Sequence, residues 1–220
     1  MKKLPFILAA LVLTGCKTEI EKDISLNQLL NGSLKTENAT LSVEIASCQD
    51  HRDSRQPSQT LISTQLKIPQ VFKNANFKEC YSSNFKSFAV FEFPVGVGVP
   101  AENTKPENDI NIISRKDIGS FLVIGAKKSF RERLDNFKKS EPLIAQLELG
   151  ITFNILNDLQ SEQKLNIVSS YINEQPFINA LSQLKSGEMI KVKLSNVASD
   201  QLISTGEQGG IVDIITQSAN

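Results

Sequence analysis

The chain has 220 residues, with 24 basic and 24 acidic side chains and an apolar content of 40%. This balanced charge excludes the basic surface of a nucleic-acid-binding protein, so no nucleic acid is expected as a partner. The apolar content is typical of a globular domain, and no stretch after the first residues has the roughly 20 apolar residues of a membrane-spanning helix.

The N-terminal residues have the pattern of a secretion signal. Lys2 and Lys3 precede the apolar run Leu4–Leu13, and its ten residues suit the apolar region of a signal peptide, which is about 7–15 residues long. Leu13-Thr14-Gly15-Cys16 follows at once. In this segment the chain resembles bacterial lipoprotein precursors, whose lipobox ends in small residues followed by a cysteine.

The resemblance implies that residues 1–15 are a signal peptide that is removed, and that Cys16 carries acyl chains such as palmitate. Membrane lipid is then a partner through those chains. Lys17 follows the cysteine, where Asp favours the inner membrane in enterobacterial lipoproteins, so the outer membrane is expected rather than the inner one. Residues 16–25 are expected to be the lipidated cysteine and a short polar tether. The alternative is an ordinary secretion signal followed by an unrelated cysteine.

Cys48 and Cys80 remain once Cys16 carries lipid. In an oxidising compartment a disulfide between them is the simplest expectation, and it predicts Cα atoms about 4.4–6.8 Å apart. The competing interpretation is a metal site, because Cys48 and His51 lie three residues apart. With a single histidine and no CxxC motif in the chain, no metal or other cofactor is expected.

Alternating apolar and polar residues predict several strands. The clearest is Leu143–Ile155, expected to pair as a hairpin with 165–172, and its apolar face is expected in a packed core rather than in a lipid-binding groove. Further strands are expected over 41–45, 87–93, 190–194 and 211–215, the second of them central because both of its faces are apolar.

Helices are expected over 26–31, 57–67, 130–138 and 196–204, the third opened by a capping box at Ser129 and Glu132. Together these elements predict an α+β fold, a mainly antiparallel sheet with a few packing helices, in a single domain over 26–220. The element order strand, helix, strand, strand occurs twice, which suggests βαββ-like lobes over 26–98 and 109–220. The loop 94–108, rich in glycine and proline, is their expected boundary or a mobile flap.

The most polar cluster contains Asp50, His51 and Asp53, where an acid–base pair is conceivable. The sequence has no G-x-S-x-G nucleophile elbow, so these residues are interpreted as a solvated loop and no catalytic residue is assigned. Glu102, Glu107 and Asp109, with Asn103 or Asn108, suggest a calcium site, but their spacing differs from an EF-hand and favours an exposed acidic loop.

The hypothesis from the sequence is therefore a membrane-anchored lipoprotein with a non-enzymatic binding domain that faces the periplasm or the cell surface. Its overall features resemble small uncharacterised envelope lipoproteins, and its expected partner is an envelope protein or a lipid. The alternative is a hydrolase of envelope polymers that uses His51 and nearby carboxylates.

Overall fold

The computed structural model describes residues 17–102, 106–115, 120–140 and 148–215. The expected signal peptide and Cys16 lie outside these residues. Within these residues the protein is mostly β, with 54% strand and 23% helix. Its strands are β1 (Lys17–Ser25), β2 (Lys35–Ile45), β3 (Asn76–Ser83), β4 (Lys86–Gly98), β5 (Ile110–Arg115), β6 (Ser120–Ala126), β7 (Glu148–Leu156), β8 (Gln163–Ile172), β9 (Gln175–Leu184), β10 (Met189–Leu194) and β11 (Glu207–Ile214). Its helices are α1 (Leu26–Asn31), α2 (Gln59–Val71), α3 (Lys128–Ser140) and α4 (Asn196–Thr205).

The sheet closes on itself into a barrel. Its nine strands follow the order β10-β7-β1-β2-β4-β5-β6-β11-β8, and β10 pairs with both β7 and β8. β3 and β9 branch from this ring, because β3 pairs with β4 and β9 pairs with β8. Two neighbouring pairs, β1 with β7 and β4 with β5, are parallel.

Closure depends on a change of partner within β8. Up to Ile167 this strand pairs with β11, and from Ser170 onwards it pairs with β10. Ser169 lies between the two halves with a φ of +50°, a left-handed conformation that costs a non-glycine residue free energy. Its carbonyl accepts the backbone N–H of Ser195 at 3.0 Å, and the two hydroxyls lie 2.8 Å apart. These bonds hold the corner at the end of β10, where the ring is completed.

Large apolar side chains fill the barrel, and two helices pack at its ends. Phe91, Phe153 and Leu41 are at most 1% exposed. Helix α1 contacts β1, β4, β5 and β6, while α4 contacts β6, β7, β8, β10 and β11. Leu29 of α1 and Leu202 of α4 are fully buried, so each helix adds its apolar face to the core.

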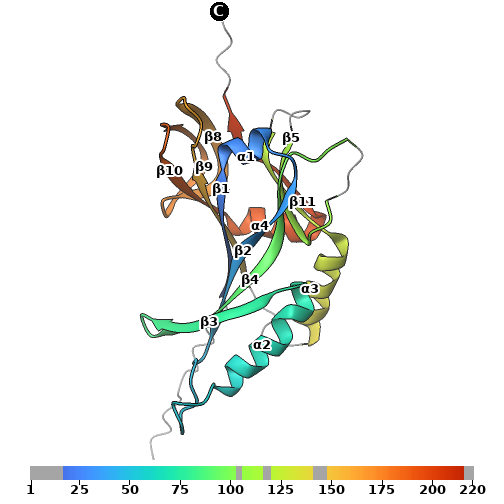
Figure 1. The fold of residues 1–220 in the computed structure, drawn as a ribbon, viewed down its shortest axis with the longest axis vertical. Coiled ribbons are helices and arrows are strands. Elements are labelled where there is room, and N and C mark those ends of the chain that lie inside the picture. The colour runs from blue at the N-terminus through green and yellow to red at the C-terminus, as the bar shows by residue number, and fades with distance from the viewer. Residues whose placement is uncertain (1–16, 103–105, 116–119, 141–147, 216–220) are drawn as a thin grey trace, which may run out of the picture.

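Helices α2 and α3 lie outside the barrel, beside the extension formed by β3 and the first part of β4 (Figure 1). Phe72, which ends α2, joins them to the core. Its ring lies 5.3 Å from that of Phe93 in β4 and 5.2 Å from that of Phe130 in α3. Each distance is in the range of favourable aromatic contact.

The predicted α+β class is therefore wrong, because the helices do not cover an open sheet but pack at the ends and flank of a closed barrel. The tether is wrong too, since residues 17–25 form β1 in the barrel wall. Ile20 and Ile24 of β1 face the core. Lys22 interrupts that apolar face, and its ammonium pairs with Glu37 at 2.8 Å. Because Lys22 is charged, the sequence of β1 does not show the alternation of apolar and polar residues that predicts a strand.

The two lobes were also predicted wrongly, although the order of their elements was right. β2 pairs with β4 inside the first unit, whereas β10 separates β7 from β8 in the second, so the expected hairpin is not formed. Residues 94–98 are no boundary, because they continue β4 and pair with β2 and β5. Gly98 has a φ of +127°, and a Cβ there would lie 2.7 Å from the carbonyl oxygen of Ser33. Residues 103–105 and 141–147 lie outside the described part of the chain.

Val192 offers a test of barrel closure, because its register partners are Phe153 in β7 and Ile172 in β8 and its side chain is fully buried. We expect Val192→Ala to lower the free energy of unfolding by about 1–3 kcal/mol, since it leaves a cavity at the closing strand. The matched control is Val197→Ala, at a side chain that is 74% exposed, with an expected change within about 0.5 kcal/mol. Urea unfolding measures both, and equal losses would contradict this role of β10.

Candidate functional site

The cluster of Asp50, His51 and Asp53 lies on an exposed loop between β2 and α2. The His51 side chain is 80% exposed, and its Nδ1 lies 3.9 Å from Asp50. The backbone N–H of Arg52 donates to Asp50 and lowers the pKa of that carboxyl, while Arg55 does the same for Asp53 through bonds of 2.9 and 3.0 Å. No hydrogen bond joins His51 to a serine within the described ranges. The loop therefore lacks both a protonated acid and an activated nucleophile.

Cys48 and Cys80 form a disulfide, with Cα atoms 5.7 Å apart, as the sequence predicts. The bond fastens this loop to β3 and leaves no thiolate for the competing metal site. Within the residues that the structure places, no group of three or more His, Cys, Asp or Glu side chains is arranged to hold a metal ion.

Asp109, one of the acidic residues suggested for calcium, serves other contacts. Asp109 accepts hydrogen bonds from Arg133 of α3 at 2.5 Å and from the backbone N–H of Lys73 at 3.1 Å. Arg133 also donates to the carbonyl of Val71, at the end of α2. Asn108 donates to Thr36. Asn103 lies outside the described residues. Asp109 is thus the link between α2, α3 and β5.

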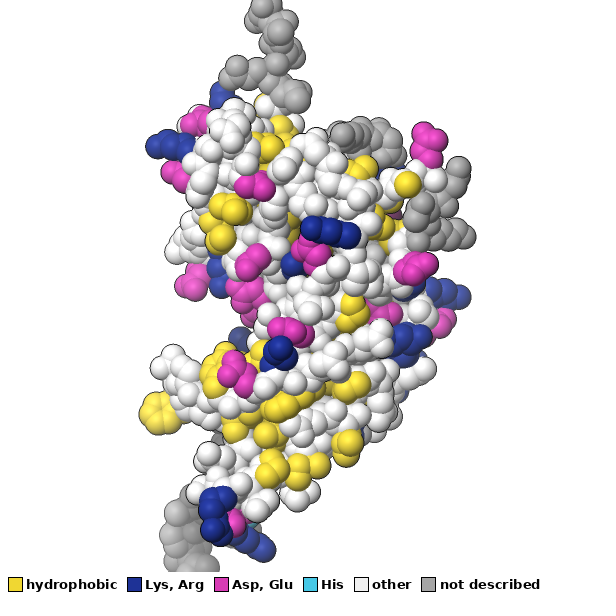
Figure 2. All heavy atoms as spheres, in the orientation of Figure 1, with side chains coloured by type: hydrophobic (Ala, Val, Ile, Leu, Met, Phe, Trp, Pro, Cys, Tyr) yellow, Lys and Arg dark blue, Asp and Glu magenta, His cyan; other side chains and the backbone are white. Residues whose placement is uncertain are grey.

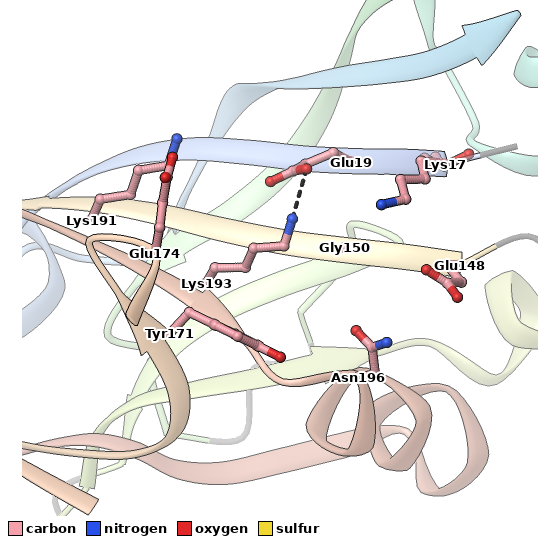
Figure 3. A pocket seen from close by; sticks show the side chains of 10 residues that line it. Lys17, Glu19, Glu148, Gly150, Tyr171, Glu174, Lys191, Lys193 and Asn196 are labelled. Carbon is pink, nitrogen blue, oxygen red and sulfur yellow. Dashed lines mark hydrogen bonds and ion pairs between the residues drawn. The ribbon is translucent and has the colours of Figure 1, made fainter. Parts of the chain in front are cut away.

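A groove of about 500 Å³ crosses the outer wall of the barrel over β1, β7 and β10 (Figure 3). On these strands its charged side chains come from positions that alternate with the buried ones, so they point away from the core, whereas Thr18 is buried. Gly150, near the start of β7, has no side chain, so the floor of the groove is low at this position. The groove is lined by Lys17, Thr18, Glu19, Glu148, Gly150, Tyr171, Glu174, Lys191, Lys193 and Asn196.

Glu19 and Lys193 form an ion pair across the floor of this groove, at 2.8 Å. Thr152 donates a second hydrogen bond to Glu19 at 2.6 Å. Burial by itself raises the pKa of Glu19, but the bonds from Lys193 and Thr152 outweigh that effect, so its pKa lies below the ordinary value. Glu19 is therefore an ionised acceptor at neutral pH and not a proton donor.

Polar contacts of the same kind continue along the outer face of these strands, and we call them the polar ladder. Asn154 of β7 donates to Glu21 and Asp23 of β1, each at 2.8 Å, and Lys191 lies 4.0 Å from Glu21. These bonds join β1, β7 and β10 on their outer face, opposite the apolar core. The groove brings both signs of charge together, with Lys193 paired to Glu19 and Lys191 to Glu21. This mixture suits the binding of a polar surface and gives no catalytic constellation.

The most unusual surface of the barrel is the free edge of β9. This strand pairs with β8 alone in the described residues, and its ten positions, QPFINALSQL, contain no charged side chain. Phe177, Ile178 and Leu181 are 42%, 91% and 76% exposed. Edge strands are usually protected by charges, so an uncharged apolar edge marks a pairing surface. No strand was predicted here from the sequence, because polar and apolar residues do not alternate along β9.

Within the described residues, buried apolar side chains occupy the interior of the barrel. Hollows lie on its outer wall, at its rim and beside the disulfide. None of the helices in the described ranges is long and apolar enough to cross a membrane.

The chain belongs to a family that is defined only as a Domain of unknown function (DUF7424), whose model matches residues 18–217. No curated protein matches the chain, and no solved structure does. The matched region begins inside β1, so the family domain includes this strand.

The Glu19 ion pair predicts an acid-sensitive stability. Because the pKa of Glu19 is lower in the folded chain than its ordinary value of 4.5, its contribution is present above that value and is lost as the pH falls through the folded pKa. Unfolding in urea between about pH 7 and about pH 3 should show a smaller loss of stability for Glu19→Gln than for the natural chain.

Glu162→Gln is the control for this measurement, because Glu162 is exposed in the turn before β8. Its pH dependence should follow that of the natural chain. An identical acid dependence of Glu19→Gln and the natural chain would contradict the role of the ion pair.

Proposed function

We propose that this protein is a lipid-anchored envelope protein of bacteria, which binds an extended polypeptide segment of an envelope partner along the free edge of β9. The anchor is Cys16, after removal of residues 1–15, and Lys17 favours the outer membrane. The binding role is non-enzymatic.

The observation that carries the binding role is the apolar, uncharged edge of β9. An extended segment that adds to such an edge gains backbone hydrogen bonds, and the alternate side chains supply specificity. Phe177, Ile178 and Leu181 offer apolar contacts next to those bonds. A barrel whose interior is filled supports this role over the carriage of a lipid, because it leaves the outer surface as the place for recognition.

The hydrolase alternative finds no support in the loop that was its basis. His51 is solvated, Asp50 and Asp53 are committed to local hydrogen bonds, and both carboxyl pKa values are lowered. A general acid needs a raised pKa and a partner within hydrogen-bond reach of the reacting group. We therefore assign no catalytic residue.

The lipid anchor predicts that cells fed labelled palmitate incorporate the label into this chain. Cys16→Ser should abolish the label and release the protein from membranes, because the acyl chains supply the attachment. The control is the double variant Cys48→Ser, Cys80→Ser, which removes the other two thiols and should keep the label. Label that persists on the Cys16→Ser chain would refute the anchor.

The β9 interface predicts position-specific crosslinking in the cell envelope. A photo-reactive amino acid placed at Ile178 or Leu181 should form an adduct with the partner, whereas the same group at Val197 should form none. Val197 is the matched control, since it is 74% exposed on α4. Leu181→Lys should suppress the adduct at position 178, because a buried lysine opposes strand addition.

Equal adducts at all three positions, or none at β9, would contradict the proposed interface. An adduct of twice the mass of the chain would show that the segment bound at β9 belongs to a second copy of this protein and not to another envelope protein.

A further inference from the structure

The hairpin of β3 and β4 projects from the body of the protein (Figure 1). Its turn carries an exposed aromatic side chain, Phe85. Asn84 and Phe85 form its two-residue turn, with φ values of +50° and +62°. Such a turn favours Asn-Gly, because the second position requires a left-handed backbone. Phe85 is instead bulky, strained and fully exposed. Its ring therefore contributes nothing to the packing of the fold.

Further apolar side chains surround the hairpin. Figure 2 shows a band of them over the lower part of the molecule, where β3 and α2 lie. Exposed members of this region are Leu66 of α2, at 66%, and Phe77 and Tyr81 of β3, at 38% and 44%. Phe77 packs on Phe91 and Tyr81 on Phe88, so the two rings lie on opposite faces of the hairpin. We call the exposed apolar side chains on both faces and at the tip, Leu66, Phe77, Tyr81 and Phe85, the hairpin patch. Tyr81 is supported from beneath by the ring of Phe88, at 5.5 Å.

The register of the sheet places the tip of the hairpin at the end of the molecule where β1 begins. Thr18 pairs with Val43, and Val43 pairs with Ala89, so these three residues lie in one row across the sheet. β1 and β4 both run antiparallel to β2 and hence in the same direction, so the residues that precede Thr18 and Ala89 lead toward the same end.

Phe85 precedes Ala89 by four residues, and Lys17, where β1 begins, precedes Thr18 by one. At about 3.3 Å per residue, the tip extends roughly 10 Å farther along the strand direction than Lys17. The two strand spacings between β1 and β4 place it about 10 Å to the side.

We propose that the hairpin patch inserts into the lipid surface to which Cys16 is anchored, with the Phe85 ring as its deepest side chain. This inference rests on the proposed lipid anchor. The occupant follows from the length of chain that is left for a tether. With β1 beginning at Lys17, no free residue separates the lipidated cysteine from the barrel, so the anchor holds the hairpin tip at the level of the bilayer surface. Tyrosine rings favour that interface, and phenylalanine side chains are buried at its boundary with the acyl chains.

The natural chain has no tryptophan, which makes a single reporter available. The full lipidated chain carrying Phe85→Trp is reconstituted into phosphatidylglycerol–phosphatidylethanolamine vesicles. We expect its emission to shift to shorter wavelength, and brominated acyl chains to quench it. The matched control is Val197→Trp, at a side chain that is 74% exposed on α4, where neither effect is expected.

A second variant, Phe85→Gly, relieves the strained turn and should unfold at the same or a higher urea concentration than the natural chain. It should transfer several-fold faster between vesicles, because one membrane contact is lost while the lipid anchor remains.

The outcomes separate this inference from the proposed function. The Phe85→Trp chain could carry the palmitate label and bind vesicles while its tryptophan emission is neither shifted nor quenched. That result would overturn the inserted hairpin and leave the lipid anchor intact. A blue shift that appears without vesicles and rises with protein concentration also overturns the inserted hairpin, in favour of a second copy on the patch. A chain that carries no lipid and does not sediment with vesicles overturns the anchor and this inference together.

Discussion

The pairing of one short strand with two partners is the constraint on which the fold depends. β10 has six residues, yet it pairs with β7 along one edge and with the last part of β8 along the other. Without the second pairing the sheet would be open, and the side chains of β7 and β8 would lose their shared core. The left-handed Ser169 and its bonds to Ser195 make that pairing geometrically available. Local strain at one residue is thus offset by closure of the whole ring.

Closure also decides where function is located. Phenylalanine, leucine and isoleucine side chains fill the barrel, and α1 and α4 pack at its two ends. The interior is therefore a packed core that stabilises the fold. Recognition then falls to surfaces outside the ring, and the two strands that branch from it, β3 and β9, are the ones that expose clusters of large apolar side chains. The polar ladder between β1, β7 and β10 has a different character, because its charges are paired and support the wall from outside.

The sequence predicted the local elements well and their arrangement poorly. β7 alternates strictly, so Leu149, Ile151, Phe153 and Ile155 were correctly placed in the core. All four helices were found near their observed positions, and α1 begins after its Ser25 cap as expected. The capping box at Ser129 and Glu132 was predicted wrongly, because α3 begins at Lys128 and Ser129 lies inside the helix. The disulfide was predicted because Cys48 and Cys80 are the two cysteines other than Cys16.

What failed were features that depend on long-range contacts. Lys22 lies at a core-facing position of β1 because Glu37, on a strand farther along the chain, neutralises it. A polar segment with one such pair resembles a tether when it is read alone. The insertion of β10 between β7 and β8 involves residues more than thirty positions away from β7, and no local pattern encodes it. β9 was missed for the opposite reason, since an edge strand with both faces exposed has no alternation to detect.

The two branch strands, β3 and β9, suit different kinds of partner, and they lie apart in the molecule. In Figure 1, with the longest axis vertical, β3 lies in the lower half of the view and β9 in the upper half. The hairpin tip projects sideways from the lower half, so the surfaces of β3 and β9 lie in different halves of the molecule. An uncharged strand edge is a hazard next to other exposed chains, and a strained phenylalanine at a turn is a cost to folding. Both are explained if each surface is covered at its own end, the hairpin by lipid and the strand edge by a protein segment that reaches it from beyond the membrane surface.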